Sequence, residues 1–344
     1  MSNRPIVLIG AGGIVESAHL PAYQKAGFEV IGITDLDRQK ARRLAKQFNV
    51  PNVYDSTQQS IICAPENVIF DIAIPASGLV DLLPIFRNGS TLLIQKPMGE
   101  NIKQARRIKQ ICQQKHLTAN VNFQMRFTPQ VIEARQMISQ GALGELHDIE
   151  MRVTVYTPWH LWDFLEKCDR VEILYHSIHY IDLIRSFWGD PNGILAKTTK
   201  HPKMMNMASS RSNIIMDYGD IKRANITTNH GHEYGLRHQE SYLKLEGTKG
   251  AIKICFGLLM DYPKGVVDSF EYRVLESQEE TEWISKEIDG TWFPDAFIGS
   301  ILNMMQPEYT GEQMDCTVED AYKTMACVEA AYQSNLSGTV SADL

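Results

Sequence analysis

The chain has 344 residues, 44% of them hydrophobic and 22% charged, and a formal net charge of −7 at pH 7. The length suggests two domains, and the composition is typical of a globular protein. The negative charge disfavours nucleic-acid binding, which usually requires a basic face. No apolar run approaches the ~20 residues that a membrane-spanning helix needs, and no secretory signal is recognisable. The six cysteines include no Cys-x-x-Cys pair, which favours reduced thiols in a cytoplasmic protein over disulfides or a zinc site.

The first strand, predicted over residues 5–9, runs straight into a glycine turn and then into a helix over 16–26. This order favours a dinucleotide-binding fingerprint, because Gly12 lets the main chain approach a pyrophosphate at the helix N-terminus. Val15 stands where the fingerprint has its third glycine, so the helix and the strand must pack less closely. We assign to the coenzyme the residues of this turn, Gly10, Gly12, Gly13 and Ile14.

The second predicted strand, residues 29–34, ends at Asp35. An acid at this place hydrogen-bonds the adenosine ribose hydroxyls and repels a 2′-phosphate, so it favours NAD over NADP. Arg38 follows three residues later and leaves NADP open as an alternative coenzyme. The other interpretation of Asp35 is an N-cap for the helix predicted over residues 37–48.

Strands and helices alternate up to residue 122, with strands over 69–75, 91–94 and 118–122 and helices over 78–88 and 102–115. This alternation predicts a parallel sheet with helices on both faces, a doubly wound Rossmann domain over residues 1–122. Ile74 and Pro75 close one of these strands, and Gln124 follows the last one. We expect all three residues to contact the coenzyme.

Lys96 follows the apolar strand 91–94 and precedes Pro97. A lysine at the carboxyl end of a parallel strand lies where open α/β sheets bind ligands, and a proline restricts the conformation of the residue before it. The alternative interpretation is a surface lysine in a turn. The sequence thus makes Lys96 a candidate contact for both coenzyme and substrate.

Beyond residue 122 the pattern changes to that of an antiparallel sheet. Residues 148–156 alternate apolar and polar side chains, as in a strand with one buried face. Six more strands are predicted over 193–199, 213–218, 224–229, 240–246, 251–256 and 270–275, and two helices over 295–305 and 317–335. Residues 123–344 are therefore predicted to form a second α/β domain with an open, mainly antiparallel sheet. Because an uncovered apolar face is unfavourable in water, we expect a partner subunit to cover its free face.

A helix predicted over residues 171–187 carries the densest group of polar side chains. At ~3.6 residues per turn, Tyr175 and His179 share one face of this helix, with Glu172 one turn earlier on the same side. The alternative interpretation of His179 is a core histidine bonded to a carboxylate. His176 and His179 are spaced for a metal, but no third ligand motif accompanies them, so we expect no metal.

Several motifs are spread along the chain: Gly10-Ala11-Gly12-Gly13-Ile14 with His19-Leu20-Pro21-Ala22, Lys96-Pro97, Arg126-Phe127-x-Pro129, Gly141-Ala142-Leu143-Gly144-Glu145, Ile178-His179-Tyr180-Ile181-Asp182-Leu183, Glu246-Gly247-Thr248-Lys249-Gly250 and Asp295-Ala296-Phe297. With these motifs the chain resembles the glucose–fructose oxidoreductase / inositol dehydrogenase / MocA (Gfo/Idh/MocA) family over nearly its whole length. The resemblance implies a Rossmann domain followed by an α/β domain with an open sheet. It also implies NAD(P)-linked oxidation or reduction of sugars, cyclitols or related polyols, often in dimers or tetramers.

The chain departs from the family pattern at two places beside its candidate catalytic groups. Gln95 replaces the glutamate of the Glu-Lys-Pro motif, which removes a charge next to the lysine. Tyr175 replaces the aspartate that normally precedes the family histidine by four residues. We expect either Glu172 or Asp182 to orient His179 in place of the missing aspartate.

The resemblance and the residues together suggest a mechanism. His179 is expected to take the proton of a substrate hydroxyl as general base, since imidazole titrates near neutral pH. Lys96 is expected to bond the same oxygen and stabilise its developing charge, and Tyr175 to donate a further hydrogen bond. The expected substrate contacts are Lys96, Arg126, Trp159, His160, Trp162, Tyr175, His176 and His179. The alternative interpretation of Arg126, Trp159, His160 and Trp162 is packing under the loop.

The sequence leaves three functional classes open. The first is an NAD(P)-dependent dehydrogenase of a sugar, sugar acid or cyclitol, forming a homodimer or homotetramer through the C-terminal sheet, with no nucleic-acid or membrane partner. The second is an enzyme with tightly bound NAD that oxidises its substrate transiently and then eliminates or isomerises it. The third is a non-catalytic sensor of dinucleotides, which has no need of Lys96 and His179 together.

Overall fold

The computed structural model describes residues 4–275, 282–305 and 316–338. The chain divides into two compact units, one comprising Met1–Thr128 with Phe293–Met325 and the other Pro129–Trp292 with Ala326–Leu344. The C-terminal part of the chain thus contributes to both units. The predicted domain boundary after residue 122 remains a prediction.

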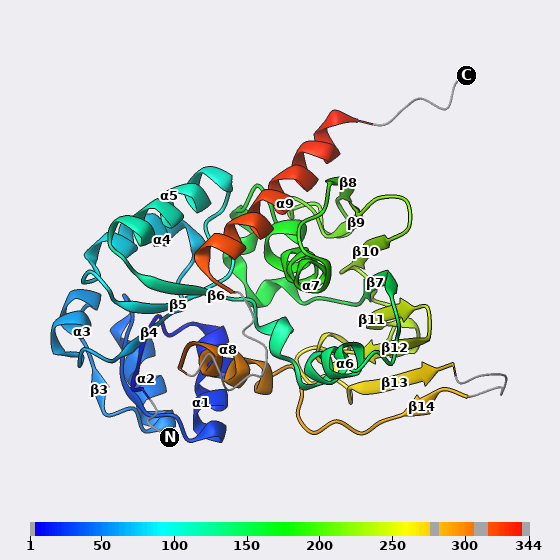
Figure 1. Cartoon of the computed structure of the whole chain (residues 1–344). Coiled ribbons are helices and arrows are strands. Elements are labelled where there is room, and N and C mark those ends of the chain that lie inside the picture. The colour runs from blue at the N-terminus through cyan, green and yellow to red at the C-terminus, as the bar shows by residue number, and fades with distance from the viewer. Residues whose placement is uncertain (1–3, 276–281, 306–315, 339–344) are drawn as a thin grey trace. The chain divides into compact units, whose positions relative to one another are not determined.

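The first unit is built on a six-stranded parallel sheet in the order β3-β2-β1-β4-β5-β6 (Figure 1). The strands are β1 Ile6–Ile9, β2 Val30–Thr34, β3 Asn52–Val53, β4 Ile69–Ile72, β5 Thr91–Gln95 and β6 Thr118–Asn122. This is the strand order of the doubly wound dinucleotide-binding fold, whose order reverses beside β1. The prediction of a Rossmann sheet is confirmed.

Helices cover both faces of this sheet, with α1 and α2 on one side and α4 and α5 on the other (Figure 1). The helices of the first unit are α1 Leu20–Ala26, α2 Arg38–Phe48, α3 Thr57–Cys63, α4 Leu79–Leu82, α5 Ile102–Gln114 and α8 Asp295–Met305. The helix predicted over 78–88 is wrong in its length, because Pro84 cannot continue an α-helix and the chain tightens to a 3₁₀ turn at Leu83–Ile85.

Local sequence explains where these helices begin. The Asp37 carboxylate accepts hydrogen bonds from the main-chain N–H groups of residues 39 and 40 and so caps α2. Asn101 caps α5 in the same way. The side chains of β1 are at most 3% exposed, and they form a core with α1, α2 and the apolar face of α8, which contributes Phe297 and Ile301. This core holds the glycine turn and the end of β2 in place.

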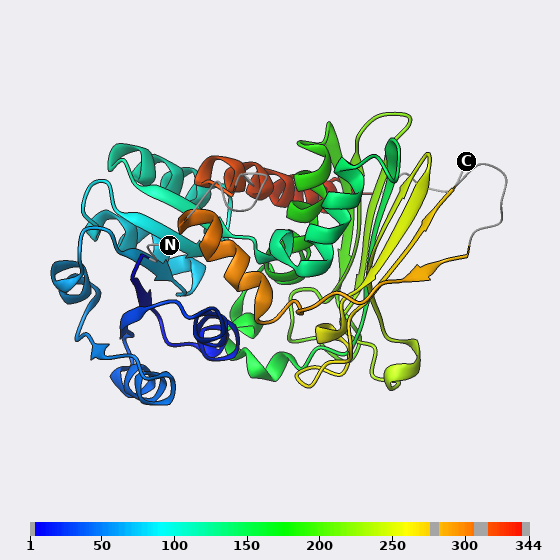
Figure 2. The ribbon, with the colours of Figure 1, turned by 60° about the horizontal axis from the view of Figure 1, so that its bottom comes forward.

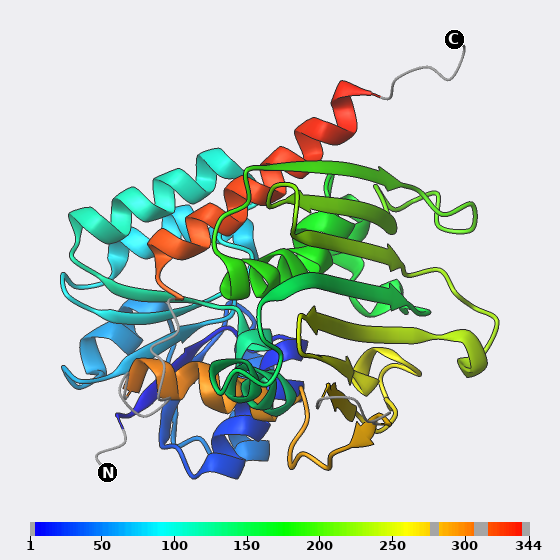
Figure 3. The same cartoon turned by 45° about the vertical axis from the view of Figure 1, so that its right-hand side comes forward.

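The second unit contains an eight-stranded sheet in the order β14-β13-β12-β11-β7-β10-β9-β8. Figure 3 shows the strands of this sheet side by side. Its strands are β7 Leu146–Thr154, β8 Gly193–Thr199, β9 Arg211–Asp217, β10 Arg223–Asn229, β11 Glu240–Gly247, β12 Gly250–Cys255, β13 Ser269–Val274 and β14 Ile284–Ser285. All neighbouring pairs are antiparallel except β7 with β10, which is parallel. The predicted open, mainly antiparallel sheet is confirmed.

Helices α6 Pro129–Ser139 and α7 Ile178–Trp188 lie against one face of this sheet (Figure 2). On β7 the apolar residues Ile149, Met151 and Val153 point to that face and are fully buried. The last helix, α9 Val318–Ser337, begins in the first unit and ends in the second. No helix within the described residues is both long and apolar enough to cross a membrane.

The opposite face of the sheet is largely polar. The sequence predicts an apolar face here. Arg152 Nε lies 2.6 Å from Glu240 Oε2, and Arg223 Nε lies 2.5 Å from Asp148 Oδ2. Leu195 and Ile215, on β8 and β9, are the exposed apolar side chains at one edge, at 64% and 51% exposure. Ion pairs of this kind remain hydrated, so apolar exposure alone does not require this face to be covered.

Candidate active site

The glycine turn between β1 and α1 fits a dinucleotide. Gly10 has φ +110°, and a Cβ there would lie 2.3 Å from the carbonyl oxygen of Ala73, so no other residue fits this position. A Cβ at Gly12 or Gly13 would meet no atom within 4 Å, so the main chain there borders open space. Ile14 is half-buried just before a π-helical turn, Val15–His19, that leads into α1.

Asp35 lies at the end of β2 beside this glycine turn. Its Oδ2 accepts a hydrogen bond of 2.6 Å from the N–H of Ala11, and its Oδ1 accepts one of 2.7 Å from the N–H of Asp37. The helix cap is Asp37, so the N-cap interpretation of Asp35 is wrong. Arg38 forms an exposed ion pair with Asp55. That pairing leaves its guanidinium less suited to a 2′-phosphate.

The other predicted coenzyme contacts lie in the same unit. Ile74 is half-buried and Pro75 exposed, directly after β4. Gln124 begins a 3₁₀ turn, Gln124–Phe127, and is 2% exposed. Within the described residues its Oε1 accepts no hydrogen bond. A buried acceptor without a donor is costly, so this oxygen is suited to receive a ligand hydrogen bond.

Lys96 directly follows β5, at the carboxyl edge of the parallel sheet. Its side chain is half-buried, and desolvation lowers the pKa of its ammonium group from 10.5 to about 8. Its main-chain N–H donates a hydrogen bond of 2.8 Å to Oε1 of Gln95. The Lys96–Pro97 peptide bond is cis.

Arg126 is also in the first unit and is 3% exposed. Its Nη2 lies 2.7 Å from Oδ2 of Asp320 in α9. The pair is buried on the arginine side, with side-chain exposures of 4% and 13%. The guanidinium therefore fastens the start of α9 to the turn after β6.

In the second unit the predicted helix over 171–187 is confirmed only from residue 178. Its first part is a π-helical turn, Glu172–Ser177. In such a turn residues five apart become neighbours, and Ser177 Oγ donates a hydrogen bond of 2.7 Å to Glu172 Oε1. This bond engages Glu172, and the expectation that either Glu172 or Asp182 orients His179 stays a prediction. His179 is 6% exposed, and its ring packs edge-on against Trp292 with centroids 6.0 Å apart.

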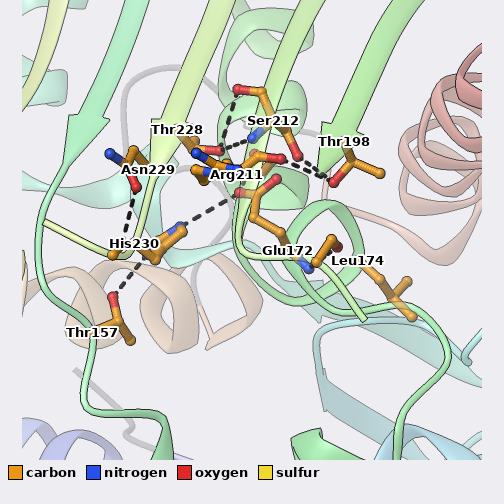
Figure 4. Close-up of polar contacts among 12 residues, drawn as sticks. Thr157, Glu172, Leu174, Thr198, Arg211, Ser212, Thr228, Asn229 and His230 are labelled. Atoms are coloured by element: carbon orange, nitrogen blue, oxygen red, sulfur yellow. Dashed lines mark hydrogen bonds and ion pairs between the residues drawn. The ribbon is translucent and has the colours of Figure 1, made fainter. Parts of the chain in front are cut away.

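Glu172 and His230 form the centre of a buried polar cluster (Figure 4). Glu172 Oε1 lies 3.5 Å from His230 Nε2, and His230 Nδ1 lies 2.8 Å from Thr157 Oγ1. Burial raises the pKa of the Glu172 carboxyl, but His230 and the hydroxyls of Ser212 and Ser177 outweigh burial and hold that pKa below its ordinary value. Sequence reasoning missed His230, because a lone histidine at the end of a strand carries no spacing signal.

The predicted aromatic contacts pack into a cluster around the start of α7. Trp159 is 5% exposed and lies edge-on to His176, with centroids 5.0 Å apart, and to His230 at 5.3 Å. Tyr175 and Trp162 are half-buried, packing on Phe164 and Tyr262 respectively, while His160 is exposed. Five of the predicted substrate residues, Trp159, Trp162, Tyr175, His176 and His179, thus come from one segment of the second unit.

The candidate residues divide between the two units. The glycine turn, Asp35, Lys96 and Gln124 belong to the first, and Tyr175 and His179 belong to the second. Among the described residues, no group of three or more His, Cys, Asp or Glu side chains is placed to hold a metal ion.

The fold and the glycine turn define a dinucleotide-binding Rossmann domain. Residues 4–123 match the Gfo/Idh/MocA oxidoreductase family's "NAD-binding Rossmann fold", and residues 135–343 match its "C-terminal alpha/beta domain". The chain therefore belongs to the Gfo/Idh/MocA oxidoreductase family. The predicted family membership and the predicted NAD-binding domain are confirmed.

Known proteins resemble the chain at low sequence identity. The protein YceM of Salmonella typhimurium is 28% identical over 143 residues, which cover 41% of this chain and only 46% of that protein. D-Apiose dehydrogenase of Rhizobium rhizogenes is 21% identical over 96% of this chain and 95% of its own. A structure of an Agrobacterium radiobacter oxidoreductase in complex with NAD⁺, L-tartaric acid and magnesium has a TM-score of 0.79 at 18% identity, over 98% of both chains. This last likeness shows the shared fold.

Proposed function

We propose that the chain is an NAD-dependent dehydrogenase that oxidises a carbinol of a sugar, sugar acid or cyclitol, or reduces the corresponding carbonyl. The observation that carries this proposal is Lys96, a half-buried lysine at the carboxyl edge of an NAD-binding sheet with a pKa of about 8. A lysine with that pKa retains a proton near neutral pH and can also release it, which suits a group that faces an oxygen of changing charge.

When bound, NAD supplies a hydride acceptor, and the residues of this chain supply orientation and proton transfer. Asp35 takes the ribose hydroxyls, and Gly12 leaves room for the diphosphate. His179 removes the hydroxyl proton as general base. Lys96 donates a hydrogen bond to the same oxygen and stabilises the negative charge that develops there.

The remaining site residues are proposed to recognise the substrate. Tyr175 and His176 are half-buried at the start of α7 and carry polar atoms able to bond hydroxyl groups. Trp162 and the exposed His160 lie one segment earlier and supply aromatic faces for sugar C–H surfaces. The ion pair of Arg126 with Asp320 favours a role in holding α9 over a direct substrate contact. The relation to a D-apiose dehydrogenase supports a carbohydrate as the substrate class.

A homodimer or homotetramer through the free face of the second sheet is part of the proposal. Leu195 and Ile215 supply apolar contact at one edge of that face, and Arg152, Glu240 and Arg223 supply charges able to pair across a two-fold axis. Sedimentation of the wild-type chain and of a Leu195→Glu variant tests this assembly. A monomeric wild-type chain at micromolar concentration would contradict it.

The test of function is a panel of D-apiose, D-glucose, D-galacturonate and myo-inositol, each offered with NAD and with NADP. Absorbance of the reduced coenzyme measures turnover, and Lys96→Met, His179→Asn and the exposed control Lys103→Met are assayed in parallel. We expect net NADH formation that Lys96→Met and His179→Asn abolish and Lys103→Met preserves. Substrate conversion without net NADH would instead support transient oxidation by a retained coenzyme.

A further inference from the structure

Three buried polar side chains connect the core of the first sheet to Lys96. Asp71, in the middle of β4, holds His19 through a contact of 2.6 Å between Oδ2 and Nδ1. His19 Nε2 lies 3.2 Å from Nε2 of Gln95. Gln95 Oε1 in turn accepts the main-chain N–H of Lys96 at 2.8 Å. His19 and Asp71 are 0% exposed and Gln95 is 9% exposed, so water does not compete for these bonds.

The arrangement is expensive to bury, which argues against simple core filling. Asp71 stands between fully buried apolar residues of β4, and a carboxylate inside a sheet loses its hydration. Its Oδ2 also accepts a hydrogen bond of 2.7 Å from the Tyr23 hydroxyl. Burial and the charge of Asp71 raise the pKa of Tyr23, which keeps that hydroxyl a donor. Oδ1 of Asp71 is buried without a hydrogen-bond partner, so the bonds to Oδ2 are the ones that fix the side chains of His19 and Tyr23.

The contacts determine the protonation of His19. The carbonyl oxygen of the Gln95 amide accepts from the Lys96 main chain, so the NH₂ group is the part that faces His19. An amide NH₂ only donates, so His19 Nε2 must accept and carries no proton. Nδ1 therefore holds the ring proton and donates it to Asp71. The aromatic neighbours of the ring are Phe297, with centroids 4.8 Å apart, and Tyr23, with centroids 6.1 Å apart, and neither adds a charge.

We propose that Asp71, His19 and Gln95 form a positioning relay that holds the main chain of Lys96, and that Gln95 keeps His19 neutral with its proton on Nδ1. The relay affects catalysis only if Lys96 is catalytic, and in this respect the inference rests on the proposed function. None of its three members touches the substrate; each acts through the next.

A carboxylate at position 95 tests the chemical part of the relay. In Gln95→Glu the side chain still accepts the Lys96 N–H, but it cannot donate to His19. His19 then lies between two acceptors, Asp71 and the new carboxylate, and gains a proton on Nε2. Gln95→Met removes both bonds at similar volume and so tests the positioning part. Gln39→Met, at an exposed position of α2, is the matched control.

Nitrogen NMR of the full chain labelled with ¹⁵N-histidine reads the state of His19 directly, with its signals assigned from their loss in His19→Gln. We expect one protonated and one unprotonated ring nitrogen in the wild-type chain at pH 7, and two protonated nitrogens in Gln95→Glu. A doubly protonated wild-type His19, or one with its proton on Nε2, would overturn the relay, and this measurement needs no substrate.

Steady-state kinetics tests the effect on Lys96, with the panel sugar that the wild-type chain oxidises fastest as the probe. We expect Gln95→Met to lower kcat by about tenfold or more while the KM for NAD changes by less than about threefold, and Gln95→Glu to retain more of kcat than Gln95→Met. An unchanged kcat in Gln95→Met refutes positioning. If Lys96→Met retains turnover, the proposed function fails, whereas the NMR result for His19 stands independently.

Discussion

Replacing Lys96 by methionine is expected to make the protein more stable while removing its activity. The pKa of Lys96 falls from 10.5 to about 8 because burial disfavours its charged form. A lowering of this size corresponds to about 3 kcal/mol of folding free energy at pH 7, where the lysine is charged in both states. Methionine fills a similar volume without a charge, so Lys96→Met should unfold at higher urea concentration than the wild-type chain.

The size of this effect depends on pH. The folded pKa lies below the unfolded one, so the unfolded chain binds more protons between about pH 8 and pH 10.5, and wild-type stability rises over that interval. The advantage of Lys96→Met should therefore be complete below pH 8 and decline towards pH 10.5. Urea unfolding at pH 7 and pH 10 measures it, with Lys103→Met as the exposed control. A Lys96→Met variant that is less stable than the wild-type chain at pH 7 would refute the reasoning.

Three further changes should act at separate places. His179→Asn should lower kcat by about a hundredfold or more with NADH affinity retained, as fluorescence titration can measure. Asp35→Ser should raise NADPH affinity relative to NADH by about tenfold, since the repelling carboxylate is lost, whereas Asp55→Ser should leave NADH affinity unchanged. Glu172→Gln should lower the free energy of unfolding by about 2 kcal/mol, because it removes the carboxylate charge at the centre of the buried cluster. The exposed Glu287→Gln should leave that free energy unchanged.

Most strands and helices along the chain, and the type of each sheet, were predictable because the hydrophobic periods are clear. The glycine turn, Asp35 and the end of β5 were placed by the same pattern, since strand ends of a parallel sheet share one edge. The two-residue strand β3 and the seven-residue α3 were missed, as both are too short to show a period.

The buried polar groups could not be predicted from local sequence. Asp71 interrupts an apolar strand, and its partner His19 lies 52 residues earlier in the chain. His230 likewise finds Glu172 only through the packing of β10 against the start of α7. The π-helical turn at Glu172–Ser177 shifts the neighbours from four residues apart to five, and no periodicity of the sequence announces it.

The central claim is that Lys96 and His179 act on one substrate oxygen in an NAD-linked oxidation. The most direct test is NADH formation across the sugar panel by the wild-type chain, Lys96→Met, His179→Asn and the double variant. We predict that each single change abolishes most of the turnover and that the double variant is little worse than either, because groups that act together are not additive. Losses that multiply in the double variant, or a single variant with near-normal turnover, would contradict the claim.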